Sequence, residues 1–130
     1  MDIVIDTSAL LAVIVGEPER DRIVALTAGH ALVGPGAIPW EVGNAFSAMF
    51  KHGRLTLAEA HEGLRIFHAV PLRLLKVDMA NALSLANQAG LYAYDAYFLD
   101  CAARHAAPLL TLDLRLRRAA KGIGIRLLEV

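Results

Sequence analysis

The stretch that decides the fold is Ile3–Val15, which reads IVIDTSALLAVIV. Its first three residues, Ile-Val-Ile, are β-branched, and such a run is typical of a strand that is buried on both faces. Asp6 follows this run directly, and the apolar segment Ser8–Val15 predicts a buried helix that has its serine near the N-cap and ends at Gly16. A buried strand that leads at once into a buried helix is typical of a parallel α/β sheet.

The same alternation continues along the chain. Further strands are expected at 31–33, 72–77, 109–112 and 125–128. Helices are expected from Pro18 to about Gly29, over about 38–51, 56–69, 78–90 and 95–106, and from Asp113 to about Lys121. This order predicts a three-layer α/β/α domain with a short parallel sheet of four to five strands. Because 130 residues suit one domain, we expect residues 1–130 to form a single unit.

Composition and charge exclude several classes of protein. With 56% hydrophobic and 20% charged residues, the chain is not intrinsically disordered, and its one cysteine excludes a disulfide framework. The net charge of zero argues against a broadly basic nucleic-acid binder, although residues 1–50 hold six acids and two bases whereas residues 101–130 hold six bases and two acids. We find neither a signal peptide nor an apolar run of the ~20 residues that span a bilayer, so we expect a cytoplasmic protein without membrane contact.

Four acidic residues stand where an α/β sheet can gather them. Asp6 and Asp113 each follow a predicted strand directly, with Thr7-Ser8 and Thr111 alongside, and ligands of open parallel sheets bind at the carboxyl ends of the strands. Glu41 and Asp95 lie in apolar helical segments without a basic residue nearby in the sequence. The alternative is that these acids are helix caps or first-turn residues that stabilise the helix dipole.

Gathered carboxylates repel one another, and this repulsion raises their pKa values unless a cation is present. Oxygen ligands select hard ions such as Mg²⁺ or Mn²⁺. An ion of this kind activates water and neutralises a phosphate, so the acids favour hydrolysis of phosphodiester bonds. The arginines of the last predicted helix (Arg115, Arg117 and Arg118) are either a solvated helix face or contacts to an RNA backbone.

Other motifs favour packing over chemistry. Cys101 and His105 have the spacing of a metal or thiolate pair but no further ligands, so we interpret them as packing residues. Trp40 and the tyrosines at 92, 94 and 97 are expected mostly in the core, with one of them possible beside a groove for a base. Asp100 lies five residues beyond Asp95 on the same predicted helix, about 140° around it, and is left out of the site. An aspartyl-phosphate phosphatase is disfavoured because Asp6-Thr7-Ser8 lacks a second aspartate.

The motifs of this chain resemble those of the PIN-domain ribonucleases, and within them the VapC-type toxins of toxin–antitoxin pairs. The resemblance covers the whole chain. It rests on four short motifs in order: Ile5-Asp6-Thr7-Ser8-Ala9-Leu10, Glu41 with Asn44, Tyr94-Asp95-Ala96-Tyr97, and Leu110-Thr111-Leu112-Asp113.

The resemblance implies that Asp6, Glu41, Asp95 and Asp113 form the Mg²⁺ or Mn²⁺ site and are the catalytic residues. It implies supporting roles for Thr7 or Ser8, through hydrogen bonds to a ligand or water, and for Asn44 beside Glu41. It also implies an endoribonuclease that acts as a toxin, forms a homodimer and is occluded by a small VapB-type antitoxin. The alternative is a PIN-like module that binds RNA or protein without catalysis.

Overall fold

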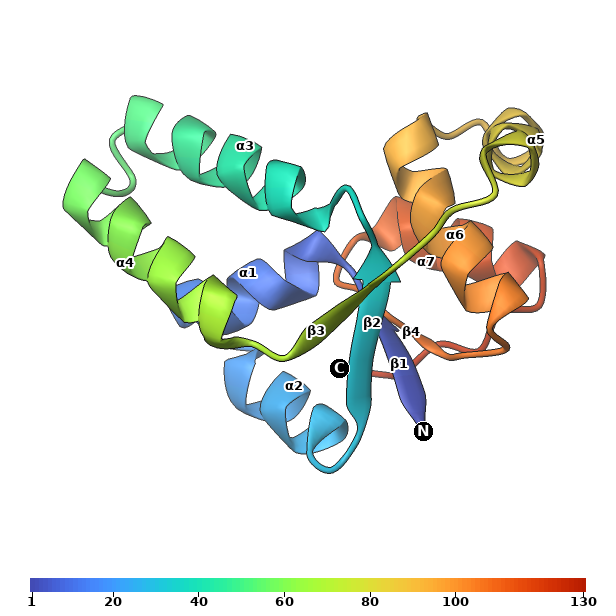
Figure 1. Cartoon of the computed structure of the whole chain (residues 1–130), viewed down its shortest axis with the longest axis horizontal. Helices are drawn as coiled ribbons and strands as arrows, with labels where there is room; N and C mark the ends of the chain where they lie inside the picture. Colours follow the sequence, from blue (N-terminus) through green and yellow to red (C-terminus); the bar gives the residue numbers. More distant parts are fainter.

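The computed structural model describes all residues from Met1 to Val130. Strands and helices follow one another along the chain as Figure 1 shows. The strands are β1 (Asp2–Ile5), β2 (Ala31–Pro35), β3 (Leu72–Leu75) and β4 (Leu109–Leu110). The helices are α1 (Thr7–Val15), α2 (Arg20–Thr27), α3 (Ile38–Lys51), α4 (Leu57–Ala69), α5 (Met79–Ala89), α6 (Ala93–Arg104) and α7 (Leu114–Gly122). No helix is both long and apolar enough to cross a lipid bilayer.

The four strands form one parallel sheet in the order β3-β2-β1-β4. Helices α1 to α4 lie to one side in Figure 1 and α5 to α7 to the other, which confirms the three-layer α/β/α prediction. β1 pairs with both β2 and β4, and its residues Ile3, Val4 and Ile5 are fully buried, as expected for a strand covered on both faces. The central position of β1 brings its carboxyl end beside that of β4.

The predicted fifth strand, 125–128, is reduced to a single parallel bridge between Leu109 and Leu127. Two backbone hydrogen bonds hold it, from Leu109 N–H to the carbonyl of Arg126 and from Leu128 N–H to the carbonyl of Leu109. Because its partner β4 has only two residues, a longer ladder cannot form. The prediction of a full strand there is wrong.

Several element ends differ from the sequence prediction. Asp6, and not Ser8, caps α1, because its carboxylate accepts the N–H of Ala9 at 3.0 Å. The second helix begins at Arg20 and not at Pro18, which lies in the turn before it. α6 begins at Ala93, so Asp95 lies within its first turn. The capping box of Thr56 and Glu59 at the start of α4 is present as predicted.

Tight packing between α3 and α4 depends on Gly63. A Cβ at this position would lie 2.7 Å from Cζ of Phe46, whose ring is part of the core. We expect Gly63→Ala to lower the free energy of unfolding by about 1–3 kcal/mol through overpacking, despite the better helix propensity of alanine. Gly43→Ala on α3, where a Cβ meets no atom within 4 Å, should instead raise it by up to about 1 kcal/mol. Urea denaturation measures both, and an equal effect of the two substitutions would contradict the packing argument.

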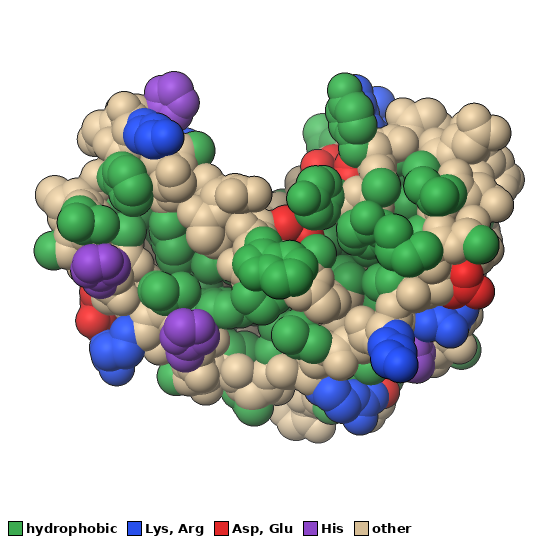
Figure 2. All heavy atoms as spheres, turned by 45° about the horizontal axis from the view of Figure 1, so that its top comes forward, with side chains coloured by type: hydrophobic (Ala, Val, Ile, Leu, Met, Phe, Trp, Pro, Cys, Tyr) green, Lys and Arg blue, Asp and Glu red, His purple; other side chains and the backbone are tan.

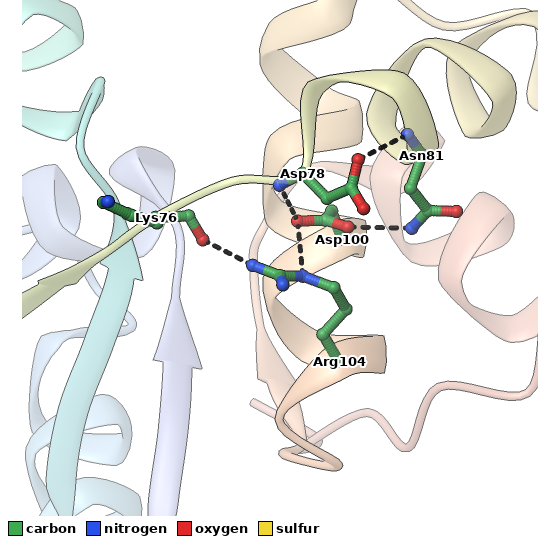
Figure 3. A network of polar contacts seen from close by, with 5 residues as sticks. All are labelled: Lys76, Asp78, Asn81, Asp100 and Arg104. Carbon is green, nitrogen blue, oxygen red and sulfur yellow. Dashed lines mark hydrogen bonds and ion pairs between the residues drawn. The ribbon is translucent and has the colours of Figure 1, made fainter.

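A buried polar network joins α5 to α6 (Figure 3). The carboxylate of Asp100 is fully buried and accepts hydrogen bonds from Asp78 N–H at 2.9 Å, Asn81 Nδ2 at 2.8 Å and Arg104 Nε at 3.1 Å. Arg104 also donates from Nη2 to the carbonyl of Lys76 at 2.7 Å. The hydrogen bonds of Asp100 therefore join α6 to the N-cap and first turn of α5, which gives this acid a structural role.

Candidate metal centre

Asp6 lies directly after β1, with its carboxylate held on both oxygens. Oδ1 accepts the hydroxyl of Ser8 at 2.7 Å and the N–H of Ala9, while Oδ2 accepts the hydroxyl of Thr111 at 2.6 Å. The last contact follows from the sheet, because Asp6 N–H donates to the carbonyl of Leu110 and so continues the pairing of β1 with β4. Asp6 is 5% exposed, and burial is the main reason that its pKa is raised.

Glu41 lies in the first turn of α3, which follows β2 closely. A Cβ on Gly34 would collide with Ile38 Cδ1, so the glycine in β2 allows α3 to start close to the sheet. Oε1 of Glu41 accepts the hydroxyl of Thr7 at 3.3 Å, whereas its Oε2 is buried and has no hydrogen-bond partner. A buried carboxylate oxygen without a partner is costly, and Oε2 is the one such side-chain atom in the protein.

Asp113 and Asp95 complete the acidic group. Asp113 follows β4 and caps α7, where one of its oxygens accepts the N–H of Leu116 at 3.0 Å. Its own N–H donates to Thr111 Oγ1 at 3.0 Å, so the same threonine contacts Asp6 and Asp113. Asp95 is half-buried in the first turn of α6 and makes no capping hydrogen bond. Asp6 and Asp113 are therefore helix caps, whereas Asp95 and Glu41 are first-turn acids, as the alternative interpretation also expects.

The four carboxylates act on one another electrostatically. Burial raises the pKa of Glu41 to about 7, and the charges of Asp6 and Asp95 add to the increase. Burial also raises the pKa of Asp95, with a further contribution from Asp113 and an opposing one from Arg115. Asp113 likewise helps to raise the pKa of Asp6. In Figure 2, acidic side chains lie in the hollow between two lobes, on the side toward which β1 and β2 point in Figure 1.

The donor set fits a hard divalent cation, although the side chains do not enclose one as they stand. No three His, Cys, Asp or Glu side chains are close enough together to form a metal-binding group. Mg²⁺, however, keeps several waters and takes one or two carboxylates directly, so it does not need a complete protein cage. The unpartnered Oε2 of Glu41, among carboxylates whose mutual repulsion raises their pKa values, is the observation that favours a cation here.

The supporting residues differ in how they relate to the acids. The hydroxyl of Thr7 donates a hydrogen bond to Glu41, and that of Ser8 donates one to Asp6, so each orients a candidate ligand. Asn44 is exposed on α3 and makes no hydrogen bond to Glu41, and its supporting role stays a prediction. Thr111 contacts two of the acids but was noted from the sequence only as a neighbour of Asp113. Its position at the end of a strand next to β1 is the signal that could have identified it.

The prediction that the aromatic residues lie mostly in the core is wrong for three of them. Trp40 is 75% exposed, Tyr92 79% and Tyr94 52%. Trp40 precedes Glu41 and Tyr94 precedes Asp95 in the first turns of their helices. Tyr94 contacts Tyr97 edge to face, with ring centroids 5.8 Å apart. Two of the four acids thus directly follow an exposed aromatic residue in the sequence.

Cys101 and His105 have the spacing of a metal or thiolate pair, but the structure does not support such a site. Cys101 is fully buried, and burial together with the charge of Asp100 raises the pKa of its thiol to about 11, whereas His105 is exposed. The pair is therefore no thiolate site, and the packing interpretation is confirmed for Cys101 but is wrong for the exposed His105.

The raised pKa of Glu41 makes stability depend on pH. Between the ordinary value of 4.5 and about 7, the folded protein binds more protons than the unfolded chain, so the free energy of unfolding falls as pH rises through this window. We expect the melting temperature of the metal-free protein to fall from pH 5 to pH 8, and Glu41→Gln to reduce the fall. Mn²⁺ should raise the melting temperature more at pH 8 than at pH 5, since the ion binds the deprotonated group.

Scanning calorimetry in a chelating buffer measures this dependence, with Glu17→Gln, an exposed acid outside the group, as the control. A pH dependence that is the same in Glu41→Gln and in the control would contradict the prediction.

The fold and the site together place this protein among the three-layer α/β proteins that carry an acidic site at the carboxyl ends of their parallel strands. The sequence-family model of the PIN domain matches residues 3–122, and the chain therefore belongs to the PIN-domain family. A search of curated proteins found no match.

Solved structures share the fold at low sequence identity. PAE2754 from Pyrobaculum aerophilum has a TM-score of 0.75 and 24% identity, over 98% of this chain and 83% of that one. VapBC2 from Rickettsia felis, bound to a DNA fragment from its promoter, has a TM-score of 0.67 and 16% identity, over 98% of both chains. FitAcB from Neisseria gonorrhoeae has a TM-score of 0.63 and 20% identity, over 98% of this chain and 96% of that one.

Proposed function

We propose that this protein is a Mg²⁺- or Mn²⁺-dependent endoribonuclease that hydrolyses phosphodiester bonds of RNA. The unpartnered, buried Oε2 of Glu41 is the observation that carries the proposal, because a cation would satisfy it and relieve the repulsion among the acids. Asp6, Glu41, Asp95 and Asp113 are the proposed ligands. The bound ion would neutralise the phosphate and lower the pKa of a water molecule.

The chain's own residues orient these ligands. Ser8, Ala9 N–H and Thr111 fix the Asp6 carboxylate, and Thr7 fixes one oxygen of Glu41 so that the other is left for the ion. The N–H of Leu116 holds one oxygen of Asp113 and leaves the second available. Such hydrogen bonds preorganise the ligands and reduce the rearrangement that binding requires.

We further propose that the protein acts in the cytoplasm as the toxin of a toxin–antitoxin pair, as a homodimer that a small VapB-type antitoxin inhibits. Two of the solved structures with this fold are a VapBC2 assembly from Rickettsia felis and a toxin–antitoxin complex from Klebsiella pneumoniae. Exposed apolar side chains such as Trp40, Tyr92 and Leu114 supply surface for a protein partner.

The test is incubation of the purified protein with a mixture of single-stranded RNAs in EDTA, in Mg²⁺ and in Mn²⁺. We expect internal cleavage only with a divalent ion, and growth arrest on expression that a small protein encoded next to the gene relieves. Metal-independent RNA binding without cleavage would instead assign a non-catalytic module. If expression of the protein does not arrest growth while the purified protein cleaves RNA with a divalent ion, the toxin role is wrong and the nuclease assignment stands.

A further inference from the structure

A cavity of about 430 Å³ lies between the end of α5 and one side of α7. Two arginines of α7, Arg115 and Arg118, line it together with Gln88 and Ala89 from the last turn of α5. The remaining wall is mostly apolar and includes Leu91. Its volume is within the range of pockets that accept small organic ligands, of about 300–1,000 Å³. The cavity therefore combines cationic groups with space for a ligand the size of a nucleotide.

The two arginines are available to a ligand. Arg115 and Arg118 are three residues apart on α7 and so project from the same side of the helix, and both are exposed. Neither takes part in any of the five ion pairs of the protein. Arg117, by contrast, points elsewhere and pairs with Glu129. Of the three arginines considered from the sequence, two thus face a cavity and one is occupied by a carboxylate.

The cavity adjoins the acidic group. Arg115 follows Asp113, the cap of α7 and a member of the acidic group, by two residues in the first turn of that helix. An RNA strand that places one phosphate at the acids can therefore extend directly to Arg115. The acids repel a polyanion, and cations beside them offset this repulsion for the neighbouring phosphates.

We propose that this cavity is a phosphate subsite for the RNA strand, in which Arg115 and Arg118 bind the phosphate of a nucleotide next to the one that is cleaved. The inference rests on the proposed function, whose substrate it extends beyond the acids. Guanidinium groups match the geometry of phosphate oxygens through paired hydrogen bonds. The apolar wall and the amide of Gln88 face the sugar and base of the same nucleotide.

The first test measures binding without cleavage. A fluorescent single-stranded RNA of 12 nucleotides is titrated in EDTA with the wild type and with Arg115→Gln, Arg118→Gln and Arg22→Gln, an exposed arginine of α2 that removes the same charge away from the cavity. We expect each cavity variant to weaken binding about tenfold and to reduce the salt dependence by about 0.7 in the log–log slope, the value for one phosphate contact on a single strand. Arg22→Gln should bind like the wild type.

A second pair of variants changes the charge inside the cavity and keeps both arginines. Ala89 is exposed at the end of α5, so both Ala89→Lys and Ala89→Glu are compatible with folding. Ala89→Lys should tighten RNA binding and Ala89→Glu should weaken it, with melting temperatures confirming that both variants are folded. Equal affinities for these two variants would contradict the proposal.

The outcomes separate this inference from the proposed function. If the Arg115 and Arg118 variants bind RNA like Arg22→Gln while the wild type cleaves RNA with Mn²⁺, the subsite is wrong and the nuclease stands. If the wild type does not cleave RNA, but the Arg115 and Arg118 variants bind RNA more weakly than the wild type does, the subsite stands and the nuclease assignment is wrong. Reduced affinity for a hexaglutamate peptide with unchanged affinity for RNA would assign the cavity to an acidic polypeptide and overturn the proposal.

Discussion

Asp6→Asn is expected to lower the rate of RNA cleavage by about 10³-fold or more, with the fold retained. A bound ion contributes several kcal/mol to stabilisation of charge in the transition state, and each 1.36 kcal/mol corresponds to a factor of ten in rate. Asparagine caps helices as well as aspartate does, so α1 keeps its N-cap, although the amide nitrogen cannot accept the Thr111 hydroxyl as Oδ2 does and some stability is lost. The measurement is single-turnover cleavage of a labelled RNA in Mn²⁺, together with thermal unfolding of the variant.

Asp21→Asn is the matched control, because Asp21 is an exposed acid of α2 outside the acidic group. It should cleave RNA at the rate of the wild type. The double variant Asp6→Asn, Asp95→Asn guards against contamination by host ribonucleases, since it should show only the background of a mock purification. Cleavage at the wild-type rate by a folded double variant would contradict the assignment of these acids to the nuclease site.

Asp100→Ala is expected to give the largest loss of stability, about 2–4 kcal/mol in the free energy of unfolding, because it removes a buried acceptor of three hydrogen bonds, although Arg104 keeps access to water. Asp100 is fully buried, and its removal leaves Arg104 Nε, Asn81 Nδ2 and the N–H of Asp78 without their acceptor (Figure 3). Urea denaturation with linear extrapolation measures the effect.

Asp100→Asn retains an acceptor of the same shape and should be less destabilised than Asp100→Ala. Asp21→Ala, which removes an exposed carboxylate, should change the free energy of unfolding by about 0.5 kcal/mol or less. If Asp100→Ala were as stable as Asp21→Ala, the network would not stabilise the contact between α5 and α6.

The order of strands and helices was predictable because each buried strand is a short apolar run and several helices begin at a side-chain cap. The rule that ligands bind at the carboxyl ends of parallel strands identified Asp6 and Asp113, and the structure places both in one electrostatic group with Glu41 and Asp95. Their use as metal ligands stays a prediction. Sequence analysis treated capping and site formation as alternatives, whereas Asp6 and Asp113 are caps that also belong to the acidic group.

Other features depend on tertiary contacts that no local pattern encodes. The hydrogen bond from Thr111 to Asp6 joins residues that are 105 positions apart, and it follows only from the pairing of β1 with β4. The sequence predicts Trp40 and Tyr94 mostly in the core, but both lie exposed in the first turns of their helices. The apolar run at 125–128 gave a single bridge because β4, its only partner, is so short.

The pairing of the first strand with the last one also determines when the acidic group can assemble during protein synthesis. β1 is synthesised more than 100 residues before Thr111 and Asp113, so Asp6 must wait for its hydrogen-bond partner at the end of the other strand. Contacts between residues so distant in sequence also form late in folding, because closing a long loop costs entropy. A nascent chain in which β4 has not yet emerged therefore lacks the hydroxyl that holds Oδ2 of Asp6, so the acidic group takes its final geometry only after the sheet has closed.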